Sequence, residues 1–517
     1  MNTTADHDAA ETLAESLVVV ETAQGKVRGR RTDGVSVFKG MRYGADTSGA
    51  NRFRPPQPVT PWTGIQDALA FGDQCPQMRG MLADKGPMSE DCLRVNVFTP
   101  GADSQRRPVM LWFHGGGFEA GSASQKVYDG SRLARRGDVV VVSINHRLNV
   151  YGHCYLGDRL GEAYAASGNA GYLDLIAAMG WVRDNIAGFG GDPDNVTLFG
   201  QSGGGRKVSL CYAGADAKGL FARGIVQSGS HLRVQTPEQA TRLTDALLAQ
   251  LEIAPADIGK LLDVPVETLT RAQLRVMRET RSRFSPVLDG LAFTAHPFQP
   301  EAPAISNNLP MMVGTTRTEL SNQLGYEDGA FDLDMAELRR RLARHVGPDD
   351  VEAAITTFQT TCPEASPSEL YFTITSARGY VLDATLMAEA RVRAGAAPTY
   401  LYQLTWRSPA DGGKHISQHT LDLPFVFDNV AAATHLTGPE SEETRAMALA
   451  MSETWLSFAR TGDPNNAAIP EWRPYDLTER PTLLFEVPPR LATDPWSAER
   501  DFMSRYETQQ MGRTLHR

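Results

Sequence analysis

Two glycine-rich patches constrain the fold of this 517-residue chain more than any other feature. Residues 114–117 read H-G-G-G, residues 200–204 read G-Q-S-G-G, and each patch follows an apolar run. The second fits G-x-S-x-G, in which a sharp strand-to-helix turn lifts a serine above a sheet. The first fits a loop whose backbone N–H groups can stabilise the negative oxygen of a tetrahedral intermediate. Together the patches predict acyl transfer through Ser202.

The two patches differ in how much each one proves. Glycine accounts for 47 residues, so G-x-S-x-G should arise by chance in about a quarter of chains of this length. H-G-G-G should be far rarer, because the chain has only 11 histidines. Both patches in this order, each behind a β-rich run, are strong evidence for the chemistry.

The apolar runs predict an α/β fold. Residues 107–113 and 138–143 read as strands buried on both faces, and apolar residues recur at helical spacing over 172–186. Further strands are predicted at 196–199, 224–227, 310–313, 400–405 and 482–487, with a helix beginning near Gly203. This alternation indicates a mostly parallel sheet covered by helices. Ligands of such sheets bind at the carboxyl ends of the strands, where both patches fall.

We expect one catalytic domain over residues 18–510, because no repeat or low-complexity linker divides the chain. Polar-faced helical segments near 236–281 and 333–396 are predicted to be insertions that cap the pocket. Residues 1–17 are polar and acidic and lack the pattern of a signal peptide. We therefore expect a disordered leader there, a short tail at 511–517 and a cytoplasmic protein.

Charge and cysteine content exclude several classes of partner. The net charge of −10 argues against nucleic acid or an anionic membrane as a main partner. No apolar stretch of about eighteen residues is present, so no membrane span is expected. The five cysteines lack the spacing of a metal site. No G-x-G-x-x-G follows an early strand, which argues against a dinucleotide-binding protein of the Rossmann type. The sequence leaves the oligomeric state open.

A serine nucleophile needs a histidine base and a carboxylate that orients it, in the chain order serine, acid, histidine. Glu319 follows the predicted strand at 310–313, although a solvated loop glutamate would look the same. His415 and His419 are both candidates for the base. Local chemistry does not choose between these two histidines.

The chain resembles the type B carboxylesterase family of α/β-hydrolases, from about residue 18 to 495. This resemblance implies an α/β-hydrolase fold and hydrolysis of carboxylic esters, with no metal or organic cofactor. It is carried by six further motifs: residues 25–29 (G-K-V-R-G), 52–56 (R-F-R-P-P), 89–97 (S-E-D-C-L-R-V-N-V), 145–149 (N-H-R-L-N), 189–193 (F-G-G-D-P) and 227–230 (Q-S-G-S).

The resemblance also assigns the ambiguous site residues. The family's acid lies five residues after a glycine at a strand end, which matches Gly314 and Glu319. The family's histidine precedes x-x-acid-(Leu/Ile)-Pro-Phe-Val-Phe, which selects His419 and places Asp422 at the acidic position. His415 is then a neighbour of the site.

The oxyanion donors that the resemblance implies are the amides of Gly116, Gly117 and Gly203. The family usually reads G-E-S-A-G at the serine, whereas this chain has Gln201 and Gly203. Gly203 keeps its N–H in a looser turn, and Gln201 removes a charge that would favour a protonated imidazole. Ser228 is expected to contact and support the side chain at position 201. The alternative is that Ser228 is a buried serine that only caps the backbone.

The segment between Cys75 and Cys92 corresponds to a loop that a disulfide closes in many secreted relatives, and a reduced pair is expected in a cytoplasm. Cholinesterases place a tryptophan in this loop, where its ring attracts a quaternary ammonium. Residues 76–91 contain no aromatic residue, but they contain Met78, Met81 and Met88, which could line a pocket. We therefore expect a small neutral ester substrate, uncharged at its alcohol end.

The sequence thus predicts a serine esterase that works through an acyl-enzyme with Ser202, Glu319 and His419. A carbamate or amide hydrolase with the same three residues is the nearest alternative. A non-catalytic adhesion or scaffold relative is the alternative from another class, although such proteins typically lose the serine.

Overall fold

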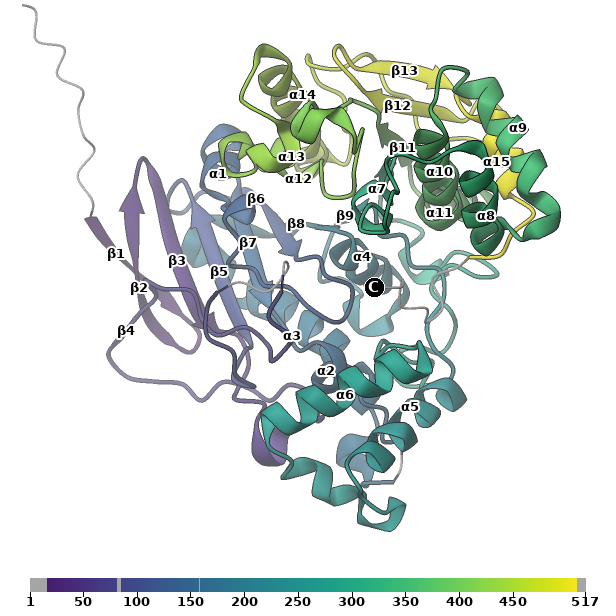
Figure 1. The fold of residues 1–517 in the computed structure, drawn as a ribbon. Helices are drawn as coiled ribbons and strands as arrows, with labels where there is room; N and C mark the ends of the chain where they lie inside the picture. Colours follow the sequence, from purple (N-terminus) through teal and green to yellow (C-terminus); the bar gives the residue numbers. More distant parts are fainter. Residues whose placement is uncertain (1–15, 81–84, 158, 509–517) are drawn as a thin grey trace, which may run out of the picture.

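The computed structural model describes residues 16–80, 85–157 and 159–508. A 13-stranded sheet runs through the molecule in the order β1-β2-β3-β5-β7-β6-β8-β9-β10-β11-β12-β13, with β4 paired to β2 (Figure 1). The strands are β1 (Ser16–Thr22), β2 (Gly25–Thr32), β3 (Val35–Arg42), β4 (Ile65–Asp67), β5 (Arg94–Thr99), β6 (Arg107–Phe113), β7 (Val140–Asn145), β8 (Gly191–Gln201), β9 (Arg223–Gln227), β10 (Met311–Thr316), β11 (Thr399–Leu404), β12 (Pro481–Phe485) and β13 (Arg490–Thr493).

The centre of the sheet, from β7 to β12, is parallel, and antiparallel strands flank it on both sides. Successive side chains of a strand point to opposite faces. On β6, Val109, Leu111 and Phe113 therefore enter one hydrophobic core, while Met110 and Trp112 enter the other. A strand buried on both faces explains why its sequence is continuously apolar.

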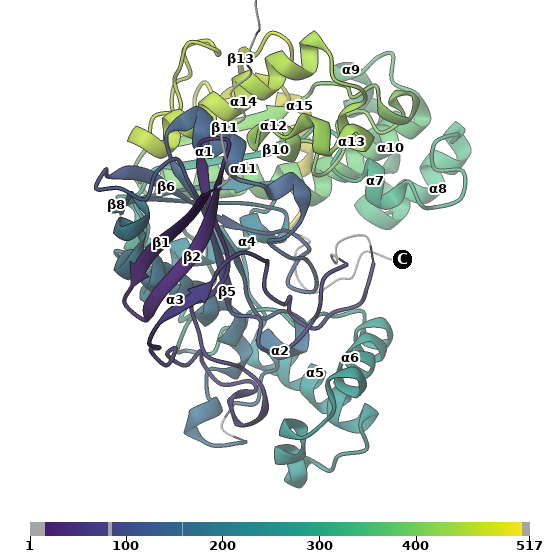
Figure 2. The same ribbon diagram turned by 90° about the vertical axis from the view of Figure 1, so that its left-hand side faces the viewer.

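Helices cover both faces of the sheet (Figure 2). One face packs against α3, α4 and α11, and the other against α1, α12 and α14. The helices are α1 (Ser131–Gly137), α2 (Asn149–His153), α3 (Ala170–Asn185), α4 (Gly203–Ala213), α5 (Pro237–Gln250), α6 (Val266–Thr280), α7 (Ser321–Leu324), α8 (Met335–Val346), α9 (Val351–Thr361), α10 (Pro367–Ser376), α11 (Leu382–Arg393), α12 (Leu423–Val426), α13 (Thr434–Thr437), α14 (Glu442–Thr461) and α15 (Ser497–Met503).

The two segments predicted to be helical insertions are helical. The first holds α5 and α6, which lie below the sheet in Figure 1, and the second holds α8 to α11 beside the C-terminal strands. Helices α8, α9 and α10 share a third hydrophobic core of their own. A π-helical turn, Ala377–Val381, joins α10 to α11 and lies next to the site described below.

Several strand boundaries differ from the predictions; β8, for example, begins at Gly191 and not at Val196. β7 begins at Val140 and not at Asp138, because Asp138 adopts a left-handed conformation with φ 46° that ends α1. β1 begins at Ser16, so the last two residues of the predicted leader pair with β2. Residues 1–15 of that leader and the predicted tail at 511–517 lie outside the described residues.

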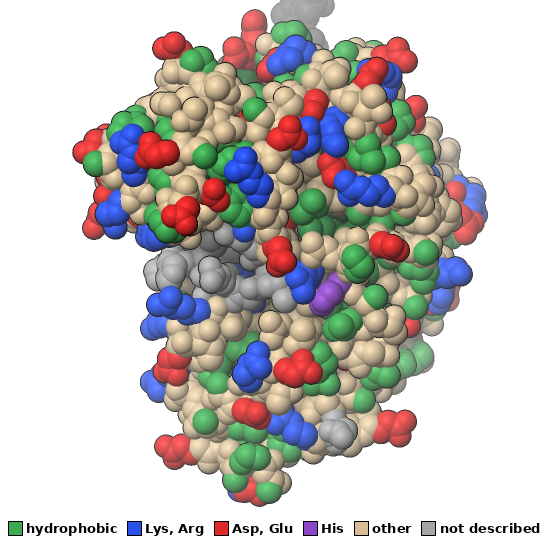
Figure 3. Space-filling model, turned by 90° about the vertical axis from the view of Figure 1, so that its right-hand side faces the viewer, with side chains coloured by type: hydrophobic (Ala, Val, Ile, Leu, Met, Phe, Trp, Pro, Cys, Tyr) green, Lys and Arg blue, Asp and Glu red, His purple; other side chains and the backbone are tan. Residues whose placement is uncertain are grey.

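Among the described residues, no helix is long and apolar enough to cross a membrane. Figure 3 shows acidic and basic side chains interspersed over the described part of one face of the molecule. The cytoplasmic location stays a prediction.

Candidate active site

Ser202 occupies a strained turn between the end of β8 and the start of α4. Its φ of 58° and ψ of −122° lie where a residue with a side chain rarely occurs, and its N–H donates to the Gln227 carbonyl at 2.8 Å. A Cβ at Gly204 would collide with the Phe113 carbonyl, so α4 can begin this close to β6 only with glycine there. The glycines of the second patch thus permit the turn that exposes Ser202.

The H-G-G-G loop brings its amides to the same place. Gly116 and Gly117 have φ values of 96° and 65°, which favour glycine. A Cβ at Gly203 would collide with the Gly117 backbone, so these two residues are in close contact. Within the described residues, no hydrogen bond uses the N–H of Gly116, Gly117 or Gly203. All three amides are free to bind an oxygen.

The Lys207 side chain anchors the H-G-G-G loop, a role that the sequence analysis did not predict. The buried ammonium donates to the carbonyls of His114 at 3.1 Å and Gly117 at 3.0 Å. Burial, followed by the neighbouring Arg206 cation, lowers the pKa of Lys207 to about 7. The sequence signal for this role is a lysine five residues after Ser202, and it does not reveal which carbonyls the ammonium reaches.

Glu319 and His419 form a buried pair at the carboxyl end of the sheet. Glu319 Oε2 lies 2.5 Å from His419 Nδ1, and Oε1 accepts the Thr316 N–H at 2.7 Å. Their loops are joined, because the Thr318 N–H donates to the Ser417 carbonyl at 3.0 Å. The carboxylate can therefore orient the imidazole with its proton on Nδ1 and leave Nε2 as the acceptor.

The L-P-F-V-F segment anchors the loop of His419 in the core. The Phe427 ring packs against Trp112 of β6 at 4.9 Å and Phe199 of β8 at 5.5 Å between centroids. Phe425 packs against Trp406 at 5.5 Å. These aromatic contacts tie the histidine loop to the strands that carry the two glycine patches.

Gln201 contacts the imidazole directly. Its Nε2 lies 3.2 Å from His419 Nε2 and 3.4 Å from His419 Nδ1. Within the described residues, Ser202 makes no hydrogen bond to His419. Such bonds often form only once substrate is bound. The Gln201 amide must therefore release Nε2 before that atom can accept the Ser202 proton.

His415 lies apart from the Glu319 carboxylate. Its Nε2 is 3.6 Å from Asp411 Oδ2, and its ring packs against Phe331. The Ser228 side chain is buried in a left-handed conformation, with φ 48°, and its Oγ makes no hydrogen bond within the described residues. The structure thus pairs only one of the two candidate histidines with the predicted acid.

Asp422 is a second buried carboxyl near the pair. Its Oδ2 accepts a hydrogen bond from Gln227 Nε2 at 2.6 Å. Burial raises the pKa of Asp422 to about 6, and Glu319 adds to this effect. The hydrogen bond from Gln227 and the charge of His419 act to lower the pKa of Asp422.

An aromatic ring from the second insertion packs against His419. Tyr380, in the π-helical turn, has its ring centroid 5.1 Å from that of His419.

Of the methionines predicted to line a pocket, Met78 is exposed, Met88 is half-buried and Met81 lies outside the described residues. Cys75 and Cys92 are buried free thiols.

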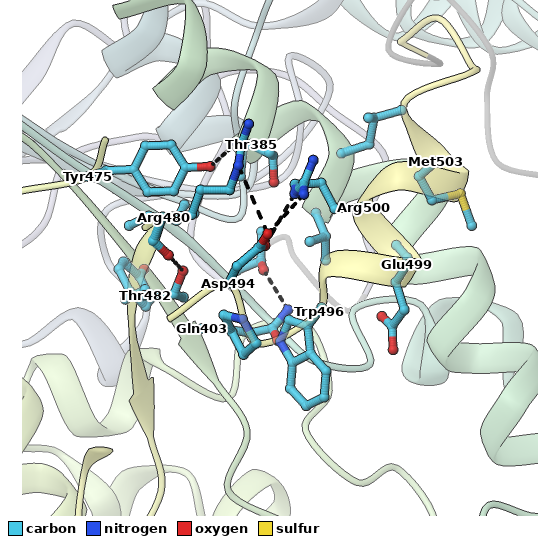
Figure 4. Close-up of a pocket in the computed structure, with 18 residues that line it drawn as sticks. Thr385, Gln403, Tyr475, Arg480, Thr482, Asp494, Trp496, Glu499, Arg500 and Met503 are labelled. Carbon is cyan, nitrogen blue, oxygen red and sulfur yellow. Dashed lines mark hydrogen bonds and ion pairs between the residues drawn. The ribbon is translucent and has the colours of Figure 1, made fainter. Parts of the chain in front are cut away.

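Figure 4 shows a separate cavity of about 60 Å³ between β11, β12 and α15. None of the predicted catalytic residues lines it. Its arginines already have a carboxylate partner, since Arg500 pairs with Asp494 at 2.8 Å and Arg480 approaches the same group at 4.0 Å. Among the described residues, no group of His, Cys, Asp or Glu is arranged to hold a metal ion.

Comparisons with known proteins agree with this geometry. Residues 16–503 match the model of the carboxylesterase family. The chain is 34% identical over 497 residues to the para-nitrobenzyl esterase of Bacillus subtilis, covering 93% of this chain and 97% of the relative. It is 30% identical to the phenmedipham hydrolase of Pseudarthrobacter oxydans, covering 88% and 92%. A crystal structure of the Geobacillus stearothermophilus carboxylesterase EST55 superposes with a TM-score of 0.84 at 38% identity, covering 94% of this chain and 99% of that one.

The matches confirm the predicted family, the α/β-hydrolase fold and the esterase class, since they span nearly the whole chain. The chain belongs to the carboxylesterase family and is a carboxylic ester hydrolase.

Proposed function

We propose that the enzyme cleaves esters through an acyl-enzyme formed on Ser202. The observation that carries this proposal is the 2.5 Å contact between Glu319 and His419 beside the turn of Ser202. His419 Nε2 takes the Ser202 proton as Oγ bonds to the acyl carbon, and the amides of Gly116, Gly117 and Gly203 stabilise the oxyanion. The acyl carbon–oxygen bond to the alcohol then breaks, and His419 protonates the leaving alkoxide.

Water completes the cycle by the same route. His419 removes a proton from water as its oxygen bonds to the acyl carbon, and the bond to Ser202 Oγ breaks as the proton returns to that oxygen. One ester and one water thus give one acid and one alcohol. We assign Glu319, and not Asp422, to orient His419, because Asp422 bonds to Gln227 instead.

We further propose that the alcohol end of the substrate is uncharged. Residues 76–91 contain no aromatic residue that could bind a quaternary ammonium there. A cation–π contact of this kind is worth about 2 kcal/mol when it is desolvated, so its loss removes the main source of preference for choline esters.

The two neighbouring histidines give a matched test of the base. His419→Ala should lower kcat by several orders of magnitude, because the Ser202 proton then has no acceptor. His415→Ala should lower kcat by at most about tenfold, or about 1.4 kcal/mol, since His415 lies against Phe331 and Asp411. Steady-state kinetics on 4-nitrophenyl butyrate measures both variants. The reverse ranking would contradict the assignment of His419.

Asp422 should make stability depend on pH. Its pKa is raised from 3.8 to about 6 in the folded protein, so between these values the folded state holds a proton that the unfolded state has lost. The contribution of Asp422 to the free energy of unfolding should therefore fall as the pH rises through this window. Relative to wild type, Asp422→Asn should gain up to about 3 kcal/mol between pH 4 and pH 7. Urea unfolding of both proteins measures this gain, and a difference independent of pH would contradict it.

The alcohol end can be tested with two butyrate esters of the same shape. Butyrylcholine and its uncharged isostere, 3,3-dimethylbutyl butyrate, should have similar kcat/KM values. A cation over an aromatic ring would raise the value for butyrylcholine about thirtyfold. A preference for butyrylcholine above about tenfold would show that another ring, such as Tyr380, binds the ammonium.

A further inference from the structure

Lys207 lies on the helix that follows Ser202, and its ammonium contacts the H-G-G-G loop. A helical side chain leans toward the N-terminus of its helix, so Lys207, four residues after Gly203, reaches back along the first turn of α4. Its Nζ donates to the carbonyls of His114 at 3.1 Å and Gly117 at 3.0 Å. The ammonium therefore holds both ends of the loop.

Gly117 connects the ammonium to the proposed oxyanion hole. Its carbonyl accepts the Lys207 hydrogen bond, and its N–H makes no hydrogen bond within the described residues. A Cβ at Gly203 would lie 2.1 Å from the Gly117 oxygen and 2.4 Å from its nitrogen, so the backbones of these two proposed donors are in contact. The Lys207 hydrogen bond thus fixes a residue that offers its N–H to the oxyanion.

The other carbonyls of the loop have neutral partners. The Gly115 carbonyl lies 2.8 Å from His114 Nδ1. The Gly116 carbonyl accepts the N–H groups of Glu119 at 3.1 Å and Ala120 at 3.0 Å. These contacts shape the loop without adding a charge to it, whereas Lys207 brings a full positive charge to the same backbone.

The charge of Lys207 is buried without a counter-ion. The residue is 1% exposed, and within the described part of the chain no Asp or Glu forms an ion pair with it. Its charged neighbour, Arg206, is also a cation, and the Phe118 ring lies 5.8 Å from Nζ. A buried ammonium in such surroundings costs stability. The oxyanion that forms during the reaction is a negative charge that can offset it.

We propose that Lys207 is a charged positioning residue of the oxyanion hole, whose ammonium fixes Gly117 and stabilises the negative charge that develops on the acyl oxygen. Positive groups that are already in place act strongly where water is excluded. The substrate carbonyl is neutral before attack, so this interaction is stronger in the transition state than in the ground state. The inference rests on the proposed function, because it adds a residue to the step at Ser202.

Replacement of Lys207 should affect kcat and not KM. Lys207→Met removes the charge and both hydrogen bonds at similar length. It should lower kcat for 4-nitrophenyl butyrate at least about tenfold, toward the hundredfold that loss of an oxyanion donor costs, with KM within about threefold of wild type. A smaller loss in kcat, or a loss confined to KM, would overturn the proposal.

Two further variants separate the charge from the bulk of the side chain. Lys207→Arg keeps the charge and should retain more of the wild-type kcat than Lys207→Met does. Lys260→Met removes a lysine whose side chain is 67% exposed and should keep the wild-type kcat. Thermal unfolding establishes that each variant is folded. Equal losses in Lys207→Arg and Lys207→Met would contradict a role for the charge.

The surroundings of Lys207 predict a loss of activity at alkaline pH. Burial lowers the pKa of Lys207 to about 7, so its charge is lost as the pH rises above this value. Burial also lowers the pKa of His114 and His153 to about 3 and that of His146 well below its ordinary value, which keeps these rings neutral. The titratable or charged groups around the ammonium are His114, His146, His153, His231 and Arg206.

The pH profile of kcat/KM tests this loss in the wild-type enzyme, because it reports the ionisation of the free enzyme. Between pH 7 and pH 9.5, wild-type kcat/KM should fall. In Lys207→Arg it should stay level, since a guanidinium keeps its charge over this range. A level wild-type profile, or the same fall in Lys207→Arg, would overturn the requirement for a charged Lys207.

A trifluoromethyl ketone tests the link to the oxyanion. When 1,1,1-trifluoroheptan-2-one binds, Ser202 Oγ bonds to the ketone carbon, the serine proton passes to His419, and the ketone oxygen becomes the oxyanion. Its inhibition constant should rise in Lys207→Met by about the factor that kcat falls, while that of heptan-2-one should not change. An unchanged constant for the fluorinated ketone would overturn the role of Lys207. Absence of any inhibition of the wild-type enzyme by it would instead overturn the proposed function.

Discussion

The proposed active centre depends on one backbone constraint, the positive φ of Ser202 between β8 and α4. Strain of this kind costs of the order of 1–3 kcal/mol and persists only where the surroundings enforce it. Here the enforcement is steric, because α4 begins so close to β6 that Gly204 admits no side chain. The same contact brings Gly203 against Gly117 and places Arg206 and Lys207 on the first turns of α4.

The proposed base, His419, and the proposed acid, Glu319, reach this turn by a different route. Both belong to loops after the C-terminal strands, and these loops are joined through Thr318 and Ser417. Burial of Phe427 against Trp112 and Phe199 then fixes the histidine loop to β6 and β8. The geometry of the Glu319–His419 pair is thus set by the core, at a long distance along the chain from Ser202.

Local patterns predicted the parts of the molecule that depend on local physics. The apolar run at residues 107–113 forms β6. The two glycine patches lie at the carboxyl ends of β6 and β8, as the sequence analysis predicted. The choice between His415 and His419 needed the register of the L-P-F-V-F motif, because the contact of His419 with Glu319 spans a hundred residues. No local pattern could show that contact.

Long-range contacts also explain what the sequence analysis missed. Tyr380 reaches His419 from the second insertion, and Lys207 reaches carbonyls of the first glycine patch. Gln201 was predicted to matter through its missing charge, but its direct contact with His419 Nε2 was not anticipated.

Covalent labelling of Ser202 tests the central claim most directly. A fluorophosphonate should add to one serine of the wild-type enzyme, the modified peptide should contain Ser202, and ester hydrolysis should stop in proportion to labelling. Ser202→Ala should keep the fold, measured by thermal unfolding, and should neither label nor hydrolyse esters. Labelling of another serine, or hydrolysis near the wild-type rate in Ser202→Ala, would contradict the account.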